Sequence, residues 1–136
     1  MSTSPSNHKL RTTPYFGVVS QSRQGVSRAL ADEVAGLVGL TNQEMAYILG
    51  MTPRNLHYIK ADQRFGTTAS ERLLLLKNVL LHALDTFEEK PKLVLQWLRT
   101  PIRELNDQSP IQLMDTVTGF GLVDDVLGRL DYGLPA

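Results

Sequence analysis

The side chains that could act as catalysts or metal ligands are few and poorly spaced for either task. The histidines His8, His57 and His82 lie far apart, and none has a histidine or glutamate four residues away, as helical metal sites require. Asp124 and Asp125 are adjacent, so on a helix their carboxylates diverge by about 100° and form no acid–base dyad. The sequence also lacks a phosphate-binding glycine loop and a nucleophile elbow. We therefore predict no enzyme activity, no metal, no cofactor and no small-molecule substrate.

Residues 42–61 favour a function in binding rather than catalysis, namely the recognition of nucleic acid. Thr52 and Pro53 form a cap-then-proline start for a short helix, and Gly50 can make the sharp turn from a preceding helix. Ala46, four residues before that glycine, would let the two helices approach closely. The inward-facing apolar positions of the pair are Met45, Leu49, Met51, Leu56 and Ile59. This spacing predicts a helix-turn-helix, whose second helix enters the DNA major groove.

The polar side chains left on the outside of this helix pair suit base edges and phosphates. We predict operator DNA as a partner, with contacts from Gln43, Thr52, Arg54, Asn55, His57, Tyr58 and Lys60. The alternative is a helix pair that keeps its shape but only packs or dimerises. Residues 1–64 hold seven basic and four acidic side chains, a net charge of +3, which is modest for a DNA-binding protein. Residues 65–136 hold seven basic and ten acidic side chains, a net charge of −3. This uneven balance favours a different partner for each half.

The elements that must position these residues are all helical. The chain has 136 residues, 42% of them hydrophobic, which predicts a folded core. Apolar residues recur at spacings of three and four from Val26 to Val38, and later helices are expected over residues 41–50, 52–61, 70–87 and from Ser109. We expect Gly119 and Gly121 to interrupt the helical pattern, so that a last helix spans residues 122–130.

Three regions follow from this pattern. Residues 1–20 are rich in Ser and Thr and are expected to form a disordered tail; residues 21–87 form the helix-turn-helix and dimerisation region, and residues 88–136 form a second small helical unit packed against it. With no cysteine and no apolar run near the roughly 20 residues of a membrane span, we expect a cytoplasmic protein that does not enter a membrane.

The stretch from Leu73 to Leu84 is apolar on more than one face of its helix. A helix of this kind is buried on several sides or packs against another chain. We take the excess apolar surface as a prediction of a homodimer.

Several short motifs follow one another in the second half of the chain: W-L-R-T-P at residues 97–101, S-P-I-Q-L-M-D-T at 109–116, Gly119, and L-G-R-L-D-Y-G at 127–133. Through these motifs, residues 89–134 resemble the toxin-binding domain of the Xre/MbcA/ParS antitoxin family. The helix-turn-helix in front matches the Xre-like half of that family. Ile102 replaces a usual asparagine, and Asn106-Asp107 replaces a Gly-rich pair, so we expect a different turn there.

The resemblance implies a non-catalytic antitoxin that dimerises and neutralises a RES-type toxin, a toxin similar to ADP-ribosyltransferases that consumes NAD. It implies that the second half lies over the entrance of the toxin's active site, and that the complex represses its own operon. Two alternatives stay open: a stand-alone transcription regulator whose second half only dimerises, and an interaction module with a vestigial helix-turn-helix.

Two features of the second half suggest how it would contact the toxin. Its carboxylates could face basic groups that otherwise hold nucleotide phosphates. Tyr132 and Leu134 could enter a pocket, with Gly133 turning the chain after the last helix. The expected toxin-binding residues are Trp97, Arg99, Asp115, Asp124, Asp125, Arg129, Asp131, Tyr132, Gly133 and Leu134.

Overall fold

The computed structural model describes residues 9–133, and all regular structure in that range is helical. The elements are α1 (Tyr15–Gln24), α2 (Arg28–Gly36), α3 (Asn42–Leu49), α4 (Pro53–Tyr58), α5 (Thr67–Thr86), α6 (Pro91–Leu98), the 3-10 turn η1 (Arg103–Leu105), α7 (Pro110–Leu113) and α8 (Val117–Asp131). The predicted all-α class is therefore confirmed. None of the described helices is long and apolar enough to cross a membrane.

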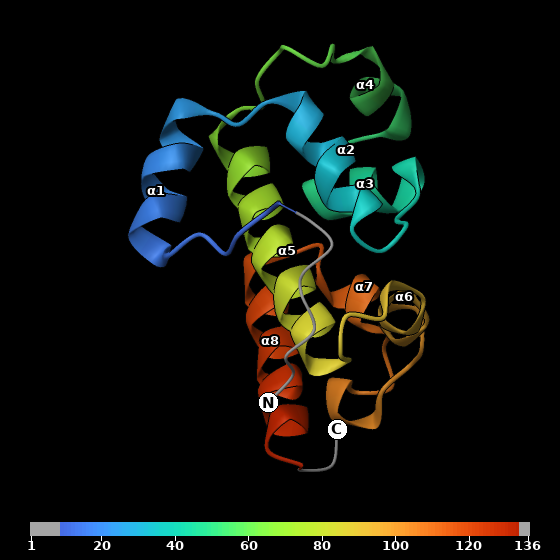
Figure 1. The fold of residues 1–136 in the computed structure, drawn as a ribbon. Coiled ribbons are helices and arrows are strands. Elements are labelled where there is room, and N and C mark those ends of the chain that lie inside the picture. The colour runs from blue at the N-terminus through green and yellow to red at the C-terminus, as the bar shows by residue number, and fades with distance from the viewer. Residues whose placement is uncertain (1–8, 134–136) are drawn as a thin grey trace.

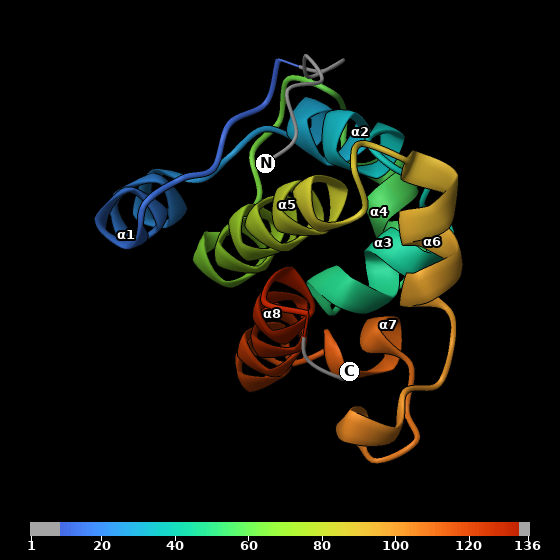
Figure 2. The ribbon, with the colours of Figure 1, turned by 60° about the horizontal axis from the view of Figure 1, so that its bottom comes forward.

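Helix α5 is the axis of the molecule. It contacts α1, α2, α3, α6 and α8, and α1 lies on one side of it while α2 to α4 lie on the other (Figures 1 and 2). Helix α8 runs beside the second half of α5. The two predicted units thus share one axis and pack together.

Most leucines of α5 are buried within this one chain. Leu73, Leu74, Leu76 and Leu80 are fully buried, and Leu84 nearly so, because neighbouring helices cover the axis on several sides. The argument for a dimer from their excess apolar surface was therefore wrong. Leu75 and Leu81 of α5 are only partly buried, and they line a groove beside α1, so a surface for a second copy would involve that groove rather than the buried leucines.

Local capping chemistry sets most helix starts. The Thr41 hydroxyl accepts the Glu44 N–H while Glu44 accepts the Thr41 N–H, which is the predicted capping box. Ser109 and Gln112 form a second box in front of α7. Gly50 has φ of 76°, so the turn between α3 and α4 takes the left-handed conformation expected for it.

The expected tail over residues 1–20 is ordered in its second part. Thr13 donates its backbone N–H to the Asn78 side chain and accepts from the Asn78 amide, both at 2.8 Å, and the buried Lys77 ammonium donates to its hydroxyl. Burial lowers the pKa of Lys77. Helix α1 then begins at Tyr15, so disorder through residue 20 was wrong; residues 1–8 lie outside the described range.

Helix α4 is shorter than expected. It ends at Tyr58 rather than near Ala61, because Ile59 is extended and the carbonyls of Ala61 and Gln63 accept hydrogen bonds from the first residues of α2. These carbonyls hold the chain in a loop against α2 and prevent another helical turn.

Helix α8 runs without a break from Val117 to Asp131, so the expected interruption at Gly119 and Gly121 was wrong. Gly119 serves close packing instead. A Cβ atom at this position would lie 1.6 Å from the Leu113 carbonyl oxygen, which only glycine avoids. The turn before α7 uses Asn106 and Asp107 at φ of 60° and 62°, a conformation that these two residue types tolerate better than most.

Candidate functional site

The predicted DNA-contacting residues lie together around α4. Gln43 is exposed in the first turn of α3, and Thr52, Arg54, Asn55, His57, Tyr58 and Lys60 are exposed on or beside α4. The Thr52 hydroxyl accepts the Asn55 N–H at 3.0 Å, so it caps α4. The Arg54 guanidinium lies 5.7 Å from the centre of the Tyr58 ring, and the His57 ring meets that ring edge-on. The outer face of α4 therefore carries polar side chains free of the core.

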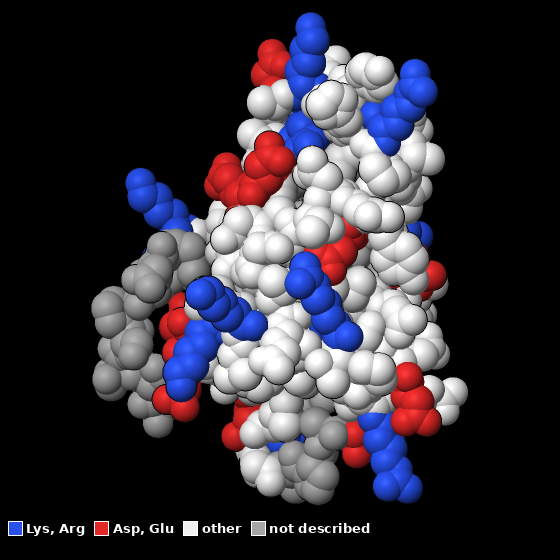
Figure 3. All heavy atoms as spheres, turned by 90° about the vertical axis from the view of Figure 1, so that its right-hand side faces the viewer, with Lys and Arg blue, Asp and Glu red and all other residues white. Residues whose placement is uncertain are grey.

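Charge on this side of the molecule is dispersed. Figure 3 shows separate basic side chains, some projecting at the end that carries α4, with acidic side chains between them. The face has no continuous basic patch, in keeping with the modest charge of residues 1–64. Affinity for DNA would then depend on a few phosphate contacts and would fall with salt.

Two of the predicted toxin-binding carboxylates are engaged within the chain. The His82 ring on α5 contacts Asp124 through Nδ1 and Asp131 through Nε2, both at 2.6 Å. Thr86, one turn further along α5, donates to the other oxygen of Asp131 at 2.6 Å. We call this four-residue cluster of His82, Thr86, Asp124 and Asp131 the α5–α8 clamp. Asp124 and Asp131 are seven residues apart, so they lie on one face of α8.

The clamp requires a charged histidine. A neutral imidazole has one N–H, whereas two carboxylates at hydrogen-bond distance require both ring nitrogens to donate. The bond to Asp124 raises the pKa of His82 to about 9 against the opposing effect of burial, and Asp131 adds to the rise. For Asp131, burial is outweighed by the bonds from Thr86 and His82, so its pKa is lowered. The imidazolium and the carboxylates thus stabilise each other.

Beyond the clamp the chain leaves α8 into solvent. Tyr132 directly follows the last helical residue and is 86% exposed, and Gly133 comes next at φ of 72°, which confirms the predicted turn after the last helix. Asp115, Asp125 and Arg129 are also exposed. Leu134 lies outside the described residues.

Trp97 and Arg99 join the two units of the chain. The Trp97 ring packs 5.6 Å from Phe87, centre to centre, at the end of α5. The Arg99 guanidinium donates twice to Glu44 of the helix-turn-helix, at 2.8 and 2.9 Å. This pair lowers the pKa of Glu44 and raises that of Arg99. Nearby, the Tyr47 hydroxyl donates to the Gln112 carbonyl at 2.7 Å.

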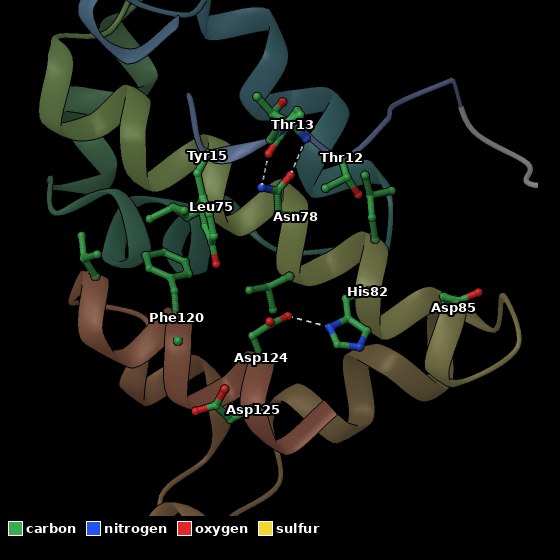
Figure 4. A pocket seen from close by; sticks show the side chains of 15 residues that line it. Thr12, Thr13, Tyr15, Leu75, Asn78, His82, Asp85, Phe120, Asp124 and Asp125 are labelled. Atoms are coloured by element: carbon green, nitrogen blue, oxygen red, sulfur yellow. Dashed lines mark hydrogen bonds and ion pairs between the residues drawn. The ribbon is translucent and has the colours of Figure 1, made fainter. Parts of the chain in front are cut away.

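A groove of about 760 Å³ lies between the start of α1 and helices α5 and α8. Tyr15 and Phe120 lie on one side of it and His82 and Asp124 on the other (Figure 4). Beside the groove, α1 exposes Phe16 (92%), Tyr15 (79%) and Val19. We call these three residues the α1 patch.

Sequence reasoning missed the clamp and the α1 patch. The spacing of Asp124 and Asp131 on one helix face is a usable signal for a shared cation, but the sequence does not indicate that His82 is that cation. Among residues 9–133 no three His, Asp or Glu side chains form a group that could hold a metal ion. The α1 patch was hidden because residues 1–20 were assigned to a tail.

The pair of helices α3 and α4, with its exposed polar face on α4, defines a helix-turn-helix protein. A second helical unit follows it in the chain and ends in the exposed side chain of Tyr132. Comparison with known proteins agrees for both units. Residues 17–76 match the antitoxin Xre-like helix-turn-helix domain, and residues 82–133 match the antitoxin Xre/MbcA/ParS C-terminal toxin-binding domain.

Two curated relatives carry the same name. Antitoxin Xre of Yersinia enterocolitica serotype O:8 / biotype 1B is 30% identical over 118 residues, which cover 86% of this chain and 80% of the relative. Antitoxin Xre of Photorhabdus laumondii subsp. laumondii is 24% identical over 140 residues, covering 94% and 95%. This chain belongs to the Xre antitoxin family, whose members are non-enzymatic components of toxin–antitoxin systems.

Proposed function

We propose that this antitoxin neutralises a RES-type toxin, one that consumes NAD by ADP-ribosyl transfer or NAD breakdown, by covering the entrance to its active site with the end of α8 and the residues after it. The observation that carries the proposal is the exposure of Tyr132, directly after a helix end that the clamp fixes. Large aromatic side chains that are exposed and held in place are typical anchors of protein interfaces. NAD is an intracellular metabolite, so the proposal places the complex in the cytoplasm.

The charges near this helix end support the same role. Asp125 and Arg129 are exposed one turn apart in the second half of α8, and Asp125 could replace a nucleotide phosphate against basic toxin groups. Asp115, which is also exposed, precedes the start of α8 and would offer a second carboxylate at the opposite end of that helix. Asp124 and Asp131 are engaged by His82, so we assign them to fixing α8 rather than to a direct contact.

Co-purification tests this proposal. The chain and the RES-type protein encoded beside its gene are expressed together, and the full chain is compared with a chain ending at Asp131, which keeps the clamp. We expect a stable complex with the full chain and a much weaker one with the shorter chain. An equally stable complex with both would move the contact onto the helices, and no complex with the full chain would contradict the proposal.

We further propose that α4 binds operator DNA, so that the antitoxin represses its own operon. The support is the exposure of Arg54, Asn55 and Lys60 on the second helix of a helix-turn-helix. Binding of the DNA upstream of the gene by the full chain, weakening as salt rises, is the expected result.

The α1 patch is the surface we propose for a second copy of the chain. Phe16 and Tyr15 expose a large apolar surface beside an open groove, and exposed apolar patches of this kind are typical of protein interaction sites. The charges are complementary, because residues 9–27, which include α1, contain Lys9, Arg11 and Arg23 and no acidic side chain, whereas Asp85 and Asp125 line the groove. In the dimer, α1 of one copy would insert into the groove of the other.

Sedimentation of two variants tests this surface. Phe16→Ala should raise the dimer dissociation constant by about tenfold or more, as for a central interface aromatic. The matched control is Leu93→Ala, since Leu93 is an exposed apolar residue on α6, away from the groove. A wild-type chain that is monomeric at micromolar concentration, or a Phe16→Ala chain that dimerises unchanged, would contradict the assignment.

A further inference from the structure

The end of α8 is held by polar contacts in addition to the apolar packing that buries the rest of the helix. Val123, Val126 and Leu127 already bury one face of α8 against the core. The last helical residue, Asp131, lies at the surface with 33% of its side chain exposed, and both of its carboxylate oxygens are bonded, one to His82 and one to Thr86. These bonds fix the point at which the chain leaves the helix.

A single side chain links two turns of α8 to α5. Because Asp124 and Asp131 are two turns apart on one face, an imidazolium bonded to both restrains the direction of α8 as well as its distance from α5. A bond to one carboxylate alone would leave the helix end free to pivot. The ring is half-buried beside the groove, with Asp85 and Asp125 as the other charged groups that line it.

We infer that His82 is a positioning residue for the toxin contact: it orients the end of α8 so that Tyr132 is presented in one direction before the toxin arrives. This inference rests on the proposed function, since it concerns how the proposed contact is prepared. Residues held in the bound geometry lose less conformational entropy on binding, so pre-organisation raises affinity without adding contacts.

The first part of the test uses the free protein. The N–H groups of Tyr132 and Gly133 donate to Arg129 and Leu130 at 3.1 and 3.0 Å, so their hydrogen exchange reports on order at the helix end. In His82→Gln, which removes the charge, we expect faster exchange at these two amides and unchanged exchange at Leu127. His82→Arg, whose guanidinium can donate to two carboxylates, should restore protection. Unchanged exchange in His82→Gln would overturn the inference.

The second part is a double-mutant cycle with the purified RES-type toxin. We expect His82→Gln to raise the toxin Kd by about tenfold in the full chain, within the range measured for coupled residues, and by less than about twofold when Tyr132 is already alanine. A merely structural role predicts the same factor in both backgrounds, and that result would overturn the inference. If the wild-type chain does not bind the toxin, the proposed function and the positioning role fail together, while the exchange data still measure the order of the helix end.

Discussion

Helices α4 and α8 carry similar numbers of polar side chains but use them differently. On α4 the polar groups are exposed, and Arg54, His57 and Tyr58 contact mainly one another. On α8 the carboxylates Asp124 and Asp131 are bonded to residues of α5 from more than 40 positions earlier. The comparison teaches that a polar helix face suggests a partner only where the fold itself leaves the face unbonded. Four variants test this contrast, from the largest expected effect on stability to the smallest.

Gly119→Ala should have the largest effect. Because a Cβ atom would lie 1.6 Å from the backbone oxygen of Leu113, α8 or α7 must shift, and we expect a loss of about 3 kcal/mol in the free energy of unfolding. Gly128→Ala on the same helix is the matched control. Apart from its chain neighbours and the nearby backbone of its own helix, no described atom lies within 4 Å of its Cβ position, so this substitution should stabilise the protein by about 0.5–1 kcal/mol. Urea denaturation measures both; equal effects would show that α8 tolerates the closer approach.

His82→Gln should lower the free energy of unfolding at pH 6 by about 1–2 kcal/mol. This loss is smaller than that expected for a fully buried ion pair, because the side chains of Asp124 and Asp131 are partly exposed and solvent screens the interaction. The folded-state pKa, about 9, lies above the ordinary 6.5. The stabilisation is therefore complete below pH 6.5, declines as the pH rises above it, and is lost as the pH passes about 9.

Denaturation of the wild type and His82→Gln at several pH values checks this dependence, with His57→Gln on α4 as the control. His57 is exposed, so its replacement should leave stability unchanged. A constant difference between wild type and His82→Gln from pH 6 to pH 10 would contradict a charged clamp.

Arg99→Gln should have a smaller effect, a loss of about 0.5 kcal/mol, because the Arg99 side chain is 46% exposed and solvent screens its pair with Glu44. Since the pair lowers the pKa of Glu44, its contribution is present above the ordinary value of 4.5 and is lost as the pH falls through the folded-state pKa. Thermal unfolding measures the change, with the exposed Arg103→Gln of η1 as control. A loss several times larger would mean that the two units depend on this pair.

The double substitution Arg54→Ala, Lys60→Ala should change stability least, by under about 0.5 kcal/mol, because both side chains are exposed. Its effect should appear in DNA binding. Each lost phosphate contact would reduce the slope of log affinity against log salt by about 0.9. Fluorescence anisotropy with the DNA upstream of the gene measures both quantities. Unchanged affinity and slope would favour the alternative in which the helix pair only packs.

Local chemistry made part of this molecule predictable. The capping box at Thr41, the turn at Gly50, the Thr52-Pro53 start and the turn at Gly133 all depend on residues within four positions of each other, and all four appear as expected. The family motifs of the second half likewise lie in short contiguous runs. Signals of this kind can be read from a sequence directly.

Features that depend on distant residues could not be predicted in this way. Helix α1 is anchored through Thr13 to Asn78, 65 positions away, so a polar stretch that resembled a tail is ordered. The continuity of α8 through Gly119 depends on the approach of Leu113. The clamp brings His82 to Asp131 across 49 positions, so a carboxylate that the sequence suggested for the toxin also has a partner within the chain.

Inhibition of the toxin tests the central claim most directly. NAD consumption by the purified RES-type toxin would be followed while the full antitoxin, or the chain ending at Asp131, is titrated in. We expect the full chain to stop NAD consumption near one antitoxin site per toxin and the shorter chain, with the clamp intact, to inhibit only at much higher concentration. Equal inhibition by both chains, or none by the full chain, would contradict the assignment of neutralisation to the residues that follow α8.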